Sequence, residues 1–382
     1  MLSSRDKVKL AMSIQRVIIS GGGTGGHIFP AVAIADEIKK RNPNAAILFV
    51  GALGKMEMEK VPQSGYEIVG LPIAGFQRKL TFSNFLLPFK IVKSLWKARS
   101  VLKKFKPELV IGVGGYASGP TLKMANLLHI PTLIQEQNSF PGKTNQLLAK
   151  KAAKICTAYS GMEQFFPSSK IVETGNPVRN LVSQQSELQE EAQKFFQLDP
   201  SKKTILVIGG SLGARTLNES VINKMALLQG SSTQVIWQCG KNYLSQMEEQ
   251  AQESWKPNVQ FHAFIQRMDL AYAAADVIIS RAGALSVSEL TLIGKPVILV
   301  PSPNVAEDHQ TKNAMALVKN DAAILVKDAE SKESLIPKAI ELLANSEACM
   351  LLSESIKKLA KPNACKDIVD VCETIINSNA AI

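Results

Sequence analysis

The stretch "VIISGGGTGGHIFPAVAIADEI", residues 17–38, joins a short apolar run to a glycine turn and then to a longer helical segment. Five of the six residues from Gly21 to Gly26 are glycine, so the chain carries almost no side chains where it turns. A glycine turn between a strand and a helix exposes backbone N–H groups and the positive end of the helix, and phosphate is its usual ligand. The stretch therefore predicts a strand, a turn and a helix that hold an anionic group.

Short apolar runs of this kind alternate with helical stretches along the chain. We predict strands at residues 16–20, 46–51, 109–114, 131–136, 154–159, 204–210, 234–239, 277–281 and 296–302. The alternation indicates βαβ units and parallel sheets whose strands are apolar on both faces. Because nine strands exceed one doubly wound domain, the sequence predicts an α/β protein with two Rossmann-like domains.

An internal similarity supports this division. The segment "LVIGGSLGARTLNESVINKM" (206–225) repeats the pattern of residues 17–38, and "LVIGVGGYASGP" (109–120) has a looser counterpart in "VIISRAGALSVSEL" (277–290). We place the boundary near "ETGNPVRN" (173–180), which gives domains at 1–176 and 177–361. All four glycine turns follow predicted strands, and ligands bind at the carboxyl ends of such strands. Two facing sheets are expected to bring the turns around one cleft.

Composition limits the class of protein. Of the 382 residues, 46% are hydrophobic and 20% are charged, as in a soluble globular protein. The five cysteines show no C-x-x-C spacing, which argues against a disulfide framework and against a zinc site. The sequence shows neither a signal peptide nor a run of about 18 uncharged apolar residues, so we expect a cytoplasmic or peripheral protein.

The net charge of +11 favours anionic partners. Between Ile68 and Pro107 there are nine Lys or Arg residues and no acidic residue, and the same stretch contains "TFSNFLLPF" (81–89). Basic charge beside bulky apolar side chains is typical of a membrane surface, whereas no motif supports nucleic-acid binding. We expect residues 90–106 to form a helix that packs on the core through one stripe, made by Ile91, Leu95, Ala98, Leu102 and Phe105. The residues expected to contact the membrane are Phe82, Phe85, Leu86 and Phe89.

Three phosphate sites are compatible with a glycine turn. A P-loop would end in G-K-[ST], but this turn ends in G-G-H. A dinucleotide site needs an acid at the end of the second strand, and none occurs before Glu57. The third site is a pyrophosphate held between glycine turns of two domains, as in nucleotide-sugar enzymes. The alternative is that the glycines only allow helix and sheet to pack.

The motifs together resemble one family. "GGGTGGHIFPAVAIADEI", "VIGVGGYASGP", "QEQNSFPGKTN", "TGNPVR", "GGSLGAR", "RAGALSVSEL", "GKPVILVPSP" and "DHQTKNA" occur in the order of the MurG family, over about residues 14–370. That family transfers N-acetylglucosamine (GlcNAc) from UDP-GlcNAc to undecaprenyl-pyrophosphoryl-MurNAc-pentapeptide (lipid I), in peptidoglycan biosynthesis. The resemblance implies a GT-B fold, a last helix at about 362–382 that returns to the N-terminal domain, and a peripheral place on the cytoplasmic face of the inner membrane, against anionic lipids.

The resemblance assigns the UDP-GlcNAc donor to the C-terminal domain. The family's contact with uracil falls on the backbone of Ile265, and its contact with the ribose hydroxyls falls on Glu289, whose two oxygens suit two hydroxyl donors. Ser211 and the N–H groups of "GGSLGAR" would hold the pyrophosphate. From the residues alone, Glu289 could instead cap a helix, and Arg179 could form a surface ion pair. The other donor contacts implied are Arg179, Gln310, Ala284 and Leu285.

The N-terminal domain is expected to complete the site. The resemblance implies acceptor contacts for Tyr116 and Ser118 in "GGYASGP". The family reaction inverts an α-linked donor to a β-1,4 product, and it needs a base for the acceptor hydroxyl. We predict that His27, at the phosphate turn, is that base or an orienting residue; the alternative is that it caps the helix. The donor contacts implied in this domain are Thr24, Gly25, Gly26 and Asn138.

No metal or cofactor is expected, because the sequence has no D-x-D motif and the helix dipoles with Arg179 would stabilise the leaving UDP. Of the other histidines, His309 adjoins Gln310 and is expected near the donor, whereas His129 lies at a strand start and is expected to be structural.

One departure affects the choice of base. The family commonly has His-Glu-Gln-Asn where this chain reads "QEQN" (135–138), and Gln135 cannot take a proton near neutral pH. Glu136 is therefore the second candidate base. Three other functions remain open from the sequence: a GT-B nucleotide-sugar epimerase or hydrolase, a dinucleotide oxidoreductase, and a non-catalytic module that binds membranes.

Overall fold

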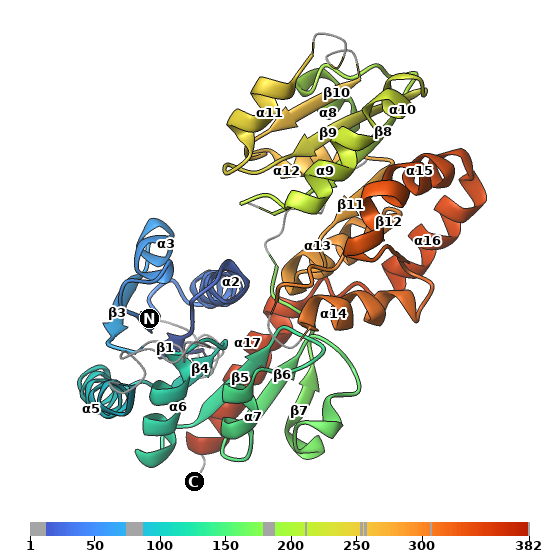
Figure 1. Ribbon diagram of the computed structural model, residues 1–382. Coiled ribbons are helices and arrows are strands. Elements are labelled where there is room, and N and C mark those ends of the chain that lie inside the picture. The colour runs from blue at the N-terminus through green and yellow to red at the C-terminus, as the bar shows by residue number, and fades with distance from the viewer. Residues whose placement is uncertain are drawn as a thin grey trace. The chain divides into compact units, whose positions relative to one another are not determined.

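The computed structural model describes residues 13–73, 87–178, 188–210, 212–252, 255, 258–305 and 308–380. The chain divides into two compact units. Unit 1 comprises Met1–Arg179 and Asn363–Ile382, and unit 2 comprises Asn180–Pro362. Each unit is built around one parallel sheet (Figure 1).

Unit 1 holds a seven-stranded sheet in the order β3-β2-β1-β4-β5-β6-β7, and all its neighbouring strands are parallel. The strands are β1 (Arg16–Ser20), β2 (Ala46–Ala52), β3 (Glu67–Leu71), β4 (Leu109–Gly112), β5 (Thr132–Glu136), β6 (Lys154–Thr157) and β7 (Ile171–Glu173). The helices are α2 (Gly25–Arg41), α3 (Glu57–Gln63), α5 (Leu87–Phe105), α6 (Ser118–Leu127), α7 (Lys143–Ala149) and α17 (Ala364–Ala380), with short 3-10 turns at Met162–Gln164 and Ser168–Lys170.

The central strands of unit 1 are buried on both faces. Successive side chains of a strand point to opposite faces, so Val17 and Ile19 of β1 join one core while Ile18 joins the other. The first core is covered by α2, α3 and α17, and the second by α5, α6 and α7. This double covering explains why these strands read as continuous apolar runs in the sequence.

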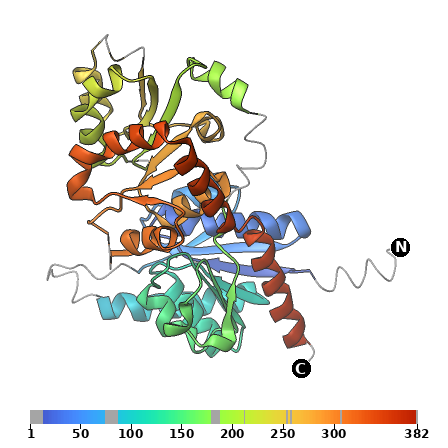
Figure 2. The ribbon, with the colours of Figure 1, turned by 90° about the vertical axis from the view of Figure 1, so that its right-hand side faces the viewer.

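The C-terminal helix α17 belongs to unit 1. It lies beside elements from the first half of the chain in both ribbon views (Figure 1 and Figure 2). Ile368, Val369 and Cys372 are fully buried in the core that α2 also covers. At the surface, the Arg41 guanidinium of α2 lies 2.6 Å from Asp370 and 3.1 Å from Glu373. An apolar seam and a group of ion pairs therefore hold the end of the chain on α2.

Helix α5 packs on the sheet by a narrow stripe. Ala98 and Leu102 are buried as expected, but Ile91, which we expected on the same stripe, is 39% exposed. The next buried position is Ser94, one turn further along the same face, so the buried stripe of α5 begins at Ser94 and leaves Ile91 outside the core. Within the described residues, no helix is long and apolar enough to span a membrane.

Unit 2 holds a six-stranded parallel sheet in the order β10-β9-β8-β11-β12-β13. The strands are β8 (Lys203–Ile208), β9 (Thr233–Gln238), β10 (Val259–His262), β11 (Val277–Ser280), β12 (Val297–Leu299) and β13 (Ile324–Leu325). The helices are α8 (Gln189–Phe195), α9 (Arg215–Asn223), α10 (Met225–Gln229), α11 (Leu244–Gln250), α12 (Met268–Ala274), α13 (Ala284–Ile293), α14 (His309–Val318), α15 (Ser331–Ala344) and α16 (Ser346–Lys358). One core cluster joins α9, α10, α11 and α15 to the sheet, around the fully buried Trp237.

Candidate functional site

Both sheets reverse their strand order at the positions of the glycine turns. In unit 1 the chain proceeds from β1 outward through β2 and β3, then returns to β4 on the other side of β1. In unit 2 the same reversal separates β8 from β11. Such switch points are where open α/β sheets bind ligands, outside the carboxyl ends of the strands. The turns after β1 and β4, and those after β8 and β11, are therefore the candidate site of each unit.

Several glycines of unit 1 allow the two turns to pack backbone to backbone. A Cβ atom on Gly21 would lie 2.2 Å from the Val113 side chain, and one on Gly115 would lie 2.3 Å from the Gly22 carbonyl oxygen. Gly115 also has a φ of +85°, which L side chains rarely adopt. The packing alternative thus accounts for these glycines, which bring the turns after β1 and β4 into contact.

Packing does not explain why two other positions are glycine. A Cβ on Gly23 would meet no atom of the described residues within 4 Å, and the same is true of Gly210 in unit 2. Both have positive φ, +89° and +86°, so glycine is favoured there by the turn itself. Gly210 is exposed and leaves open space beside its backbone, as an anion site requires, whereas the Gly23 N–H already donates to the Glu57 carboxylate.

His27 is the third residue of α2 and lies at the unit 1 switch point, directly after the glycine turn. Its Nδ1 lies 3.0 Å from the Gly22 carbonyl oxygen and 3.3 Å from the Thr24 hydroxyl. A carbonyl oxygen only accepts hydrogen bonds, so Nδ1 donates to it, and in the neutral ring the lone pair then belongs to Nε2. The Nε2 edge of the ring lies against Gly114, in the turn after β4. A Cβ atom on Gly114 would lie 2.9 Å from His27 Nε2. His27 therefore lies where the two turns meet.

Glu136 ends β5 and is 2% exposed. One carboxylate oxygen accepts from the Asn138 backbone N–H (3.0 Å) and side chain (3.3 Å), and the other from the Gly142 N–H (3.2 Å) and the Asn145 side chain (2.8 Å). Burial raises the pKa of this carboxyl, and the four donors act against that shift. An acid enclosed in this way holds the loop between β5 and α7, so we assign Glu136 to loop positioning rather than to proton transfer.

Gln135 takes part in a buried network of amides. Its side chain donates to Asn176 (3.1 Å) and accepts from Gln137, while the Asn176 amide donates to the Gln137 carbonyl (3.0 Å). Both glutamines and Asn176 are almost fully buried. The residue that replaces the family histidine therefore joins the "TGNP" segment to β5 in the interior.

The remaining unit 1 residues differ in exposure. Thr24, Gly26 and Tyr116 are exposed, and Gly25 and Asn138 are partly buried. The Ser118 hydroxyl is buried and lies 2.7 Å from the Ser20 carbonyl oxygen and 2.9 Å from that of Gly114. Ser118 thus ties the two turns together, and we do not retain it as an acceptor contact.

In unit 2, Glu289 lies inside α13 rather than at its first turn, which argues against a helix cap. Its Oε2 accepts from the Tyr272 hydroxyl at 3.3 Å, and burial, together with this carboxylate, raises the Tyr272 pKa. Gln310, in the first turn of α14, accepts from the Ser302 N–H at 2.8 Å. The Ile265 N–H donates to the Gln238 side chain at 2.9 Å.

The other predicted residues of unit 2 lie at the start of α13. Ala284 and Leu285 are its first two residues and are partly exposed. Five predicted residues lie outside the described part of the chain: Arg179, Ser211, Phe82, Phe85 and Leu86. Where the structure is described, no group of three or more His, Cys, Asp or Glu residues could hold a metal ion.

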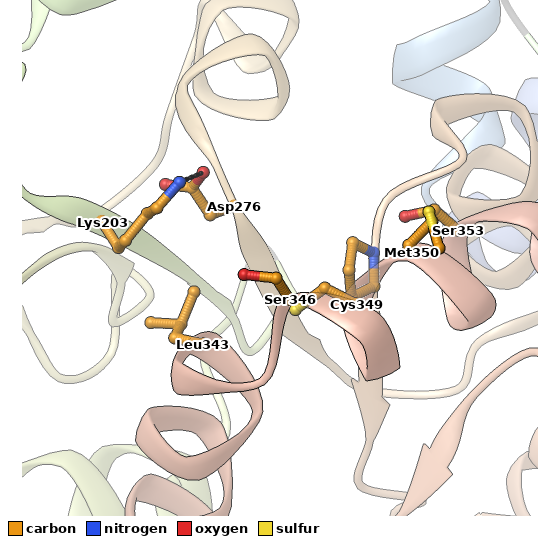
Figure 3. Close-up of a pocket in the computed structure, with 8 residues that line it drawn as sticks. Lys203, Asp276, Leu343, Ser346, Cys349, Met350 and Ser353 are labelled. Carbon is orange, nitrogen blue, oxygen red and sulfur yellow. Dashed lines mark hydrogen bonds and ion pairs between the residues drawn. The ribbon is translucent and has the colours of Figure 1, made fainter.

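A cavity of about 260 Å³ in unit 2 lies away from the glycine turns (Figure 3). Lys203 begins β8, while Asp276 and Pro296 directly precede β11 and β12, so the cavity is at the amino edge of the sheet. Lys203 and Asp276 lie side by side in its lining and form an ion pair of 3.4 Å. It is therefore at the opposite edge from the unit 2 switch point.

Sequence reasoning missed two charged residues beside the switch points. Glu57, at the start of α3, accepts from the backbone N–H groups of Gly23 and Ala52. Arg281, directly after β11, donates to the Val300 carbonyl (3.0 Å) and pairs with Asp328. A polar residue directly after an apolar strand was a usable signal for Arg281. Nothing in the local pattern around Glu57 pointed to the turn after β1.

Comparison with protein families assigns both units. Residues 17–157 match the glycosyltransferase family 28 N-terminal domain, and residues 204–370 match the family 28 C-terminal domain. These spans contain the switch points of the two sheets. The two matches occur in the same order as the units in the chain.

Relatives are similar over almost the whole chain. A UDP-N-acetylglucosamine–N-acetylmuramyl-(pentapeptide) pyrophosphoryl-undecaprenol N-acetylglucosamine transferase of Bacteroides fragilis is 58% identical, with 91% of this chain and 92% of the relative covered. The protein of that name from Flavobacterium psychrophilum is 55% identical over 96% and 99%. The crystal structure of Acinetobacter baumannii MurG has a TM-score of 0.75 at 30% identity, over 94% of this chain and 99% of that one. The predicted α/β fold of the GT-B class is confirmed.

Proposed function

The chain belongs to the MurG family of glycosyltransferase family 28, and we propose from this premise that it transfers GlcNAc from UDP-GlcNAc to the C4 hydroxyl of MurNAc in lipid I. The product is lipid II, a precursor of peptidoglycan. The observation that carries the proposal is the high identity, over both units, to proteins named for this transfer. The epimerase or hydrolase alternative is not favoured, because those relatives are named transferases.

We assign the donor to unit 2. The Glu289 carboxylate accepts from the two ribose hydroxyls, and the Ile265 carbonyl accepts from uracil. Gln310 binds the sugar hydroxyls, and its side chain is already oriented by the Ser302 N–H. Ala284 and Leu285 line the approach at the start of α13, whose positive end favours the diphosphate. Gly210, with open space beside it, and Ser211 belong to the turn that holds the pyrophosphate, and Arg179 is a further contact of that group.

The chemistry is assigned to His27 in unit 1. Its Nε2 takes the proton from the C4 hydroxyl while that oxygen bonds to the anomeric carbon of GlcNAc. The bond between the anomeric carbon and the UDP oxygen breaks in the same step, so the α-linked donor yields a β-1,4 product. Thr24, Gly25 and Gly26 supply backbone dipoles on the donor, Asn138 is a further donor contact, and Tyr116 lies on the acceptor side. The mechanism needs no cofactor.

We also propose that unit 1 docks on the cytoplasmic leaflet of the inner membrane through α5. Phe89 and Trp96 are 76% and 69% exposed, and Val92 is exposed between them. Lys93, Lys97, Arg99, Lys103 and Lys104 are exposed on the same helix. Apolar side chains that enter the headgroup region beside lysines that attract anionic lipids would bring the enzyme to its lipid-linked acceptor.

Substituting both aromatic residues, Phe89→Ser with Trp96→Ser, should weaken binding to vesicles that contain phosphatidylglycerol about tenfold, because two side chains lose their apolar contact. Sedimentation with vesicles measures the effect. Leu351→Ser is the control, since Leu351 is also exposed, at 53%, but lies on α16 between two acidic residues, Glu347 and Glu354. Equal binding by the double variant and the control would contradict docking through α5.

The release of UDP tests the reaction class. With UDP-GlcNAc and a soluble lipid I analogue, we expect UDP release that depends on the acceptor. Release without the acceptor would indicate a hydrolase, and conversion of the sugar without net release would indicate an epimerase. Either result would overturn the proposed function.

A further inference from the structure

Glu57 is a buried acid whose two oxygens hold two different backbone segments. It is 1% exposed at the start of α3. Its Oε2 accepts from the Gly23 N–H at 2.8 Å, in the turn after β1, and its Oε1 accepts from the Ala52 N–H at 2.9 Å, at the end of β2. A buried carboxylate needs such donors, since an unpaired charge is costly to bury. The acid therefore fixes the glycine turn to the neighbouring strand.

The glycines around Glu57 leave the space that its side chain occupies. A Cβ on Gly22 would lie 2.2 Å from the Glu57 carboxyl carbon, and a Cβ on Gly51 would lie 2.5 Å from its Cγ. The side chain thus passes through space that any other residue at either position would fill. Gly22, which belongs to the turn predicted to hold an anion, therefore makes room for this carboxylate.

One peptide group links Glu57 to His27. The N–H that Glu57 holds belongs to Gly23, and the carbonyl oxygen 3.0 Å from His27 Nδ1 belongs to Gly22. These are the two ends of the same peptide bond. The carboxylate, the Gly22–Gly23 peptide and the imidazole therefore form a continuous chain of two hydrogen bonds.

A carboxylate at one end of a peptide group polarises it. The negative charge draws the N–H and increases electron density on the carbonyl oxygen, and linked hydrogen bonds strengthen one another by roughly 10–30% each. The carbonyl then becomes a better acceptor for Nδ1–H. This favours the tautomer with its lone pair on Nε2 and stabilises the imidazolium that forms when Nε2 takes a proton. The arrangement corresponds to the carboxylate–histidine pair of hydrolytic triads, with a peptide group inserted.

We propose that Glu57 is a positioning residue which, through the Gly22–Gly23 peptide, holds the His27 ring with Nδ1 protonated and makes its Nε2 a stronger base. The inference rests on the proposed function of His27. Glu57 does not touch the substrate in this account. Its effect passes entirely through the peptide group and the imidazole.

The substitution Glu57→Gln tests the proposal. One amide oxygen replaces two carboxylate oxygens, and the NH₂ group opposes one of the two N–H donors. We expect kcat to fall about tenfold while KM for UDP-GlcNAc stays within about twofold, because a base is weakened and no donor contact is removed. Glu59→Gln, on the same helix but exposed, should leave both constants unchanged.

The His27 tautomer provides a readout that does not depend on activity. The chain has four histidines, so the ring nitrogens can be assigned by ¹⁵N labelling and a His27→Gln spectrum. The wild type should show the Nδ1–H tautomer for His27, and Glu57→Gln should shift it towards a mixture.

If Glu57→Gln fails to fold, the wild-type spectrum still decides: an Nε2–H tautomer of His27 in the wild type would overturn the proposal. So would an unchanged tautomer in a variant that has lost activity, since the loss would then be structural. Wild type without transferase activity but with the expected tautomer shift would overturn the proposed function and leave the relay supported.

Discussion

Replacing His27 with alanine should lower kcat for GlcNAc transfer by about 10²- to 10⁴-fold, the usual contribution of a positioned general base. The Kd for UDP-GlcNAc should change little, because the ring contacts the turn through Nδ1 and, in the mechanism we propose, Nε2 meets the acceptor hydroxyl rather than the donor. Steady-state kinetics with a lipid I analogue and calorimetric titration with UDP-GlcNAc measure the two quantities separately.

The control for His27 is a histidine in the same unit that lies away from the switch point. His129 is exposed at the end of α6 with a φ of +56°, a conformation that asparagine tolerates, so His129→Asn should retain full activity. A near-normal kcat for His27→Ala would mean that water, rather than His27, is the base. Equal loss of kcat and of donor affinity would mean that the ring only shapes the turn.

Replacing Glu289 with alanine should weaken binding of UDP-GlcNAc by about 1.5–3 kcal/mol, roughly 10- to 150-fold, the range for hydrogen bonds to a charged group. The partners lost under the proposed function are the two ribose hydroxyls, which are present in both the substrate and the transition state. KM should therefore rise much more than kcat falls. Titration with UDP-GlcNAc measures the affinity directly.

Tyr272 provides the control for Glu289. Truncating Glu289 also removes the acceptor of the buried Tyr272 hydroxyl, which lowers stability independently of the donor. Tyr272→Phe removes that hydrogen bond alone, and it should leave the affinity for UDP-GlcNAc within about twofold of wild type. If the two variants weaken binding equally, Glu289 acts by supporting α13 rather than by binding ribose.

The strands predicted from the sequence are those in the middle of the sheets. The nine predicted runs correspond to β1, β2, β4, β5, β6, β8, β9, β11 and β12. The four missed strands, β3, β7, β10 and β13, are the outermost strands of the two sheets. An edge strand is covered on fewer sides, so its sequence stays mixed: β3 reads "EIVGL" and β10 reads "VQFH". Apolar periodicity therefore reports central strands and misses edges.

The candidate site was predictable in position but not in its contacts. Glycine turns after apolar strands located both switch points, since this depends only on local order along the chain. The purpose of each glycine depends on what faces it: Gly115 faces Gly22, and Gly22 faces Glu57 from another element. The enclosure of Glu136 by Asn138, Gly142 and Asn145 could not be predicted either, because it depends on how the following loop folds back.

The most direct test of the account follows the sugar itself. Purified enzyme, labelled UDP-GlcNAc and a lipid I analogue should yield one labelled lipid product for each UDP released, and proton NMR of that product should show GlcNAc joined β-1,4 to MurNAc. Label that appears in free sugar, in an isomer of the donor or in an α-linked product would contradict an inverting transfer to the C4 hydroxyl.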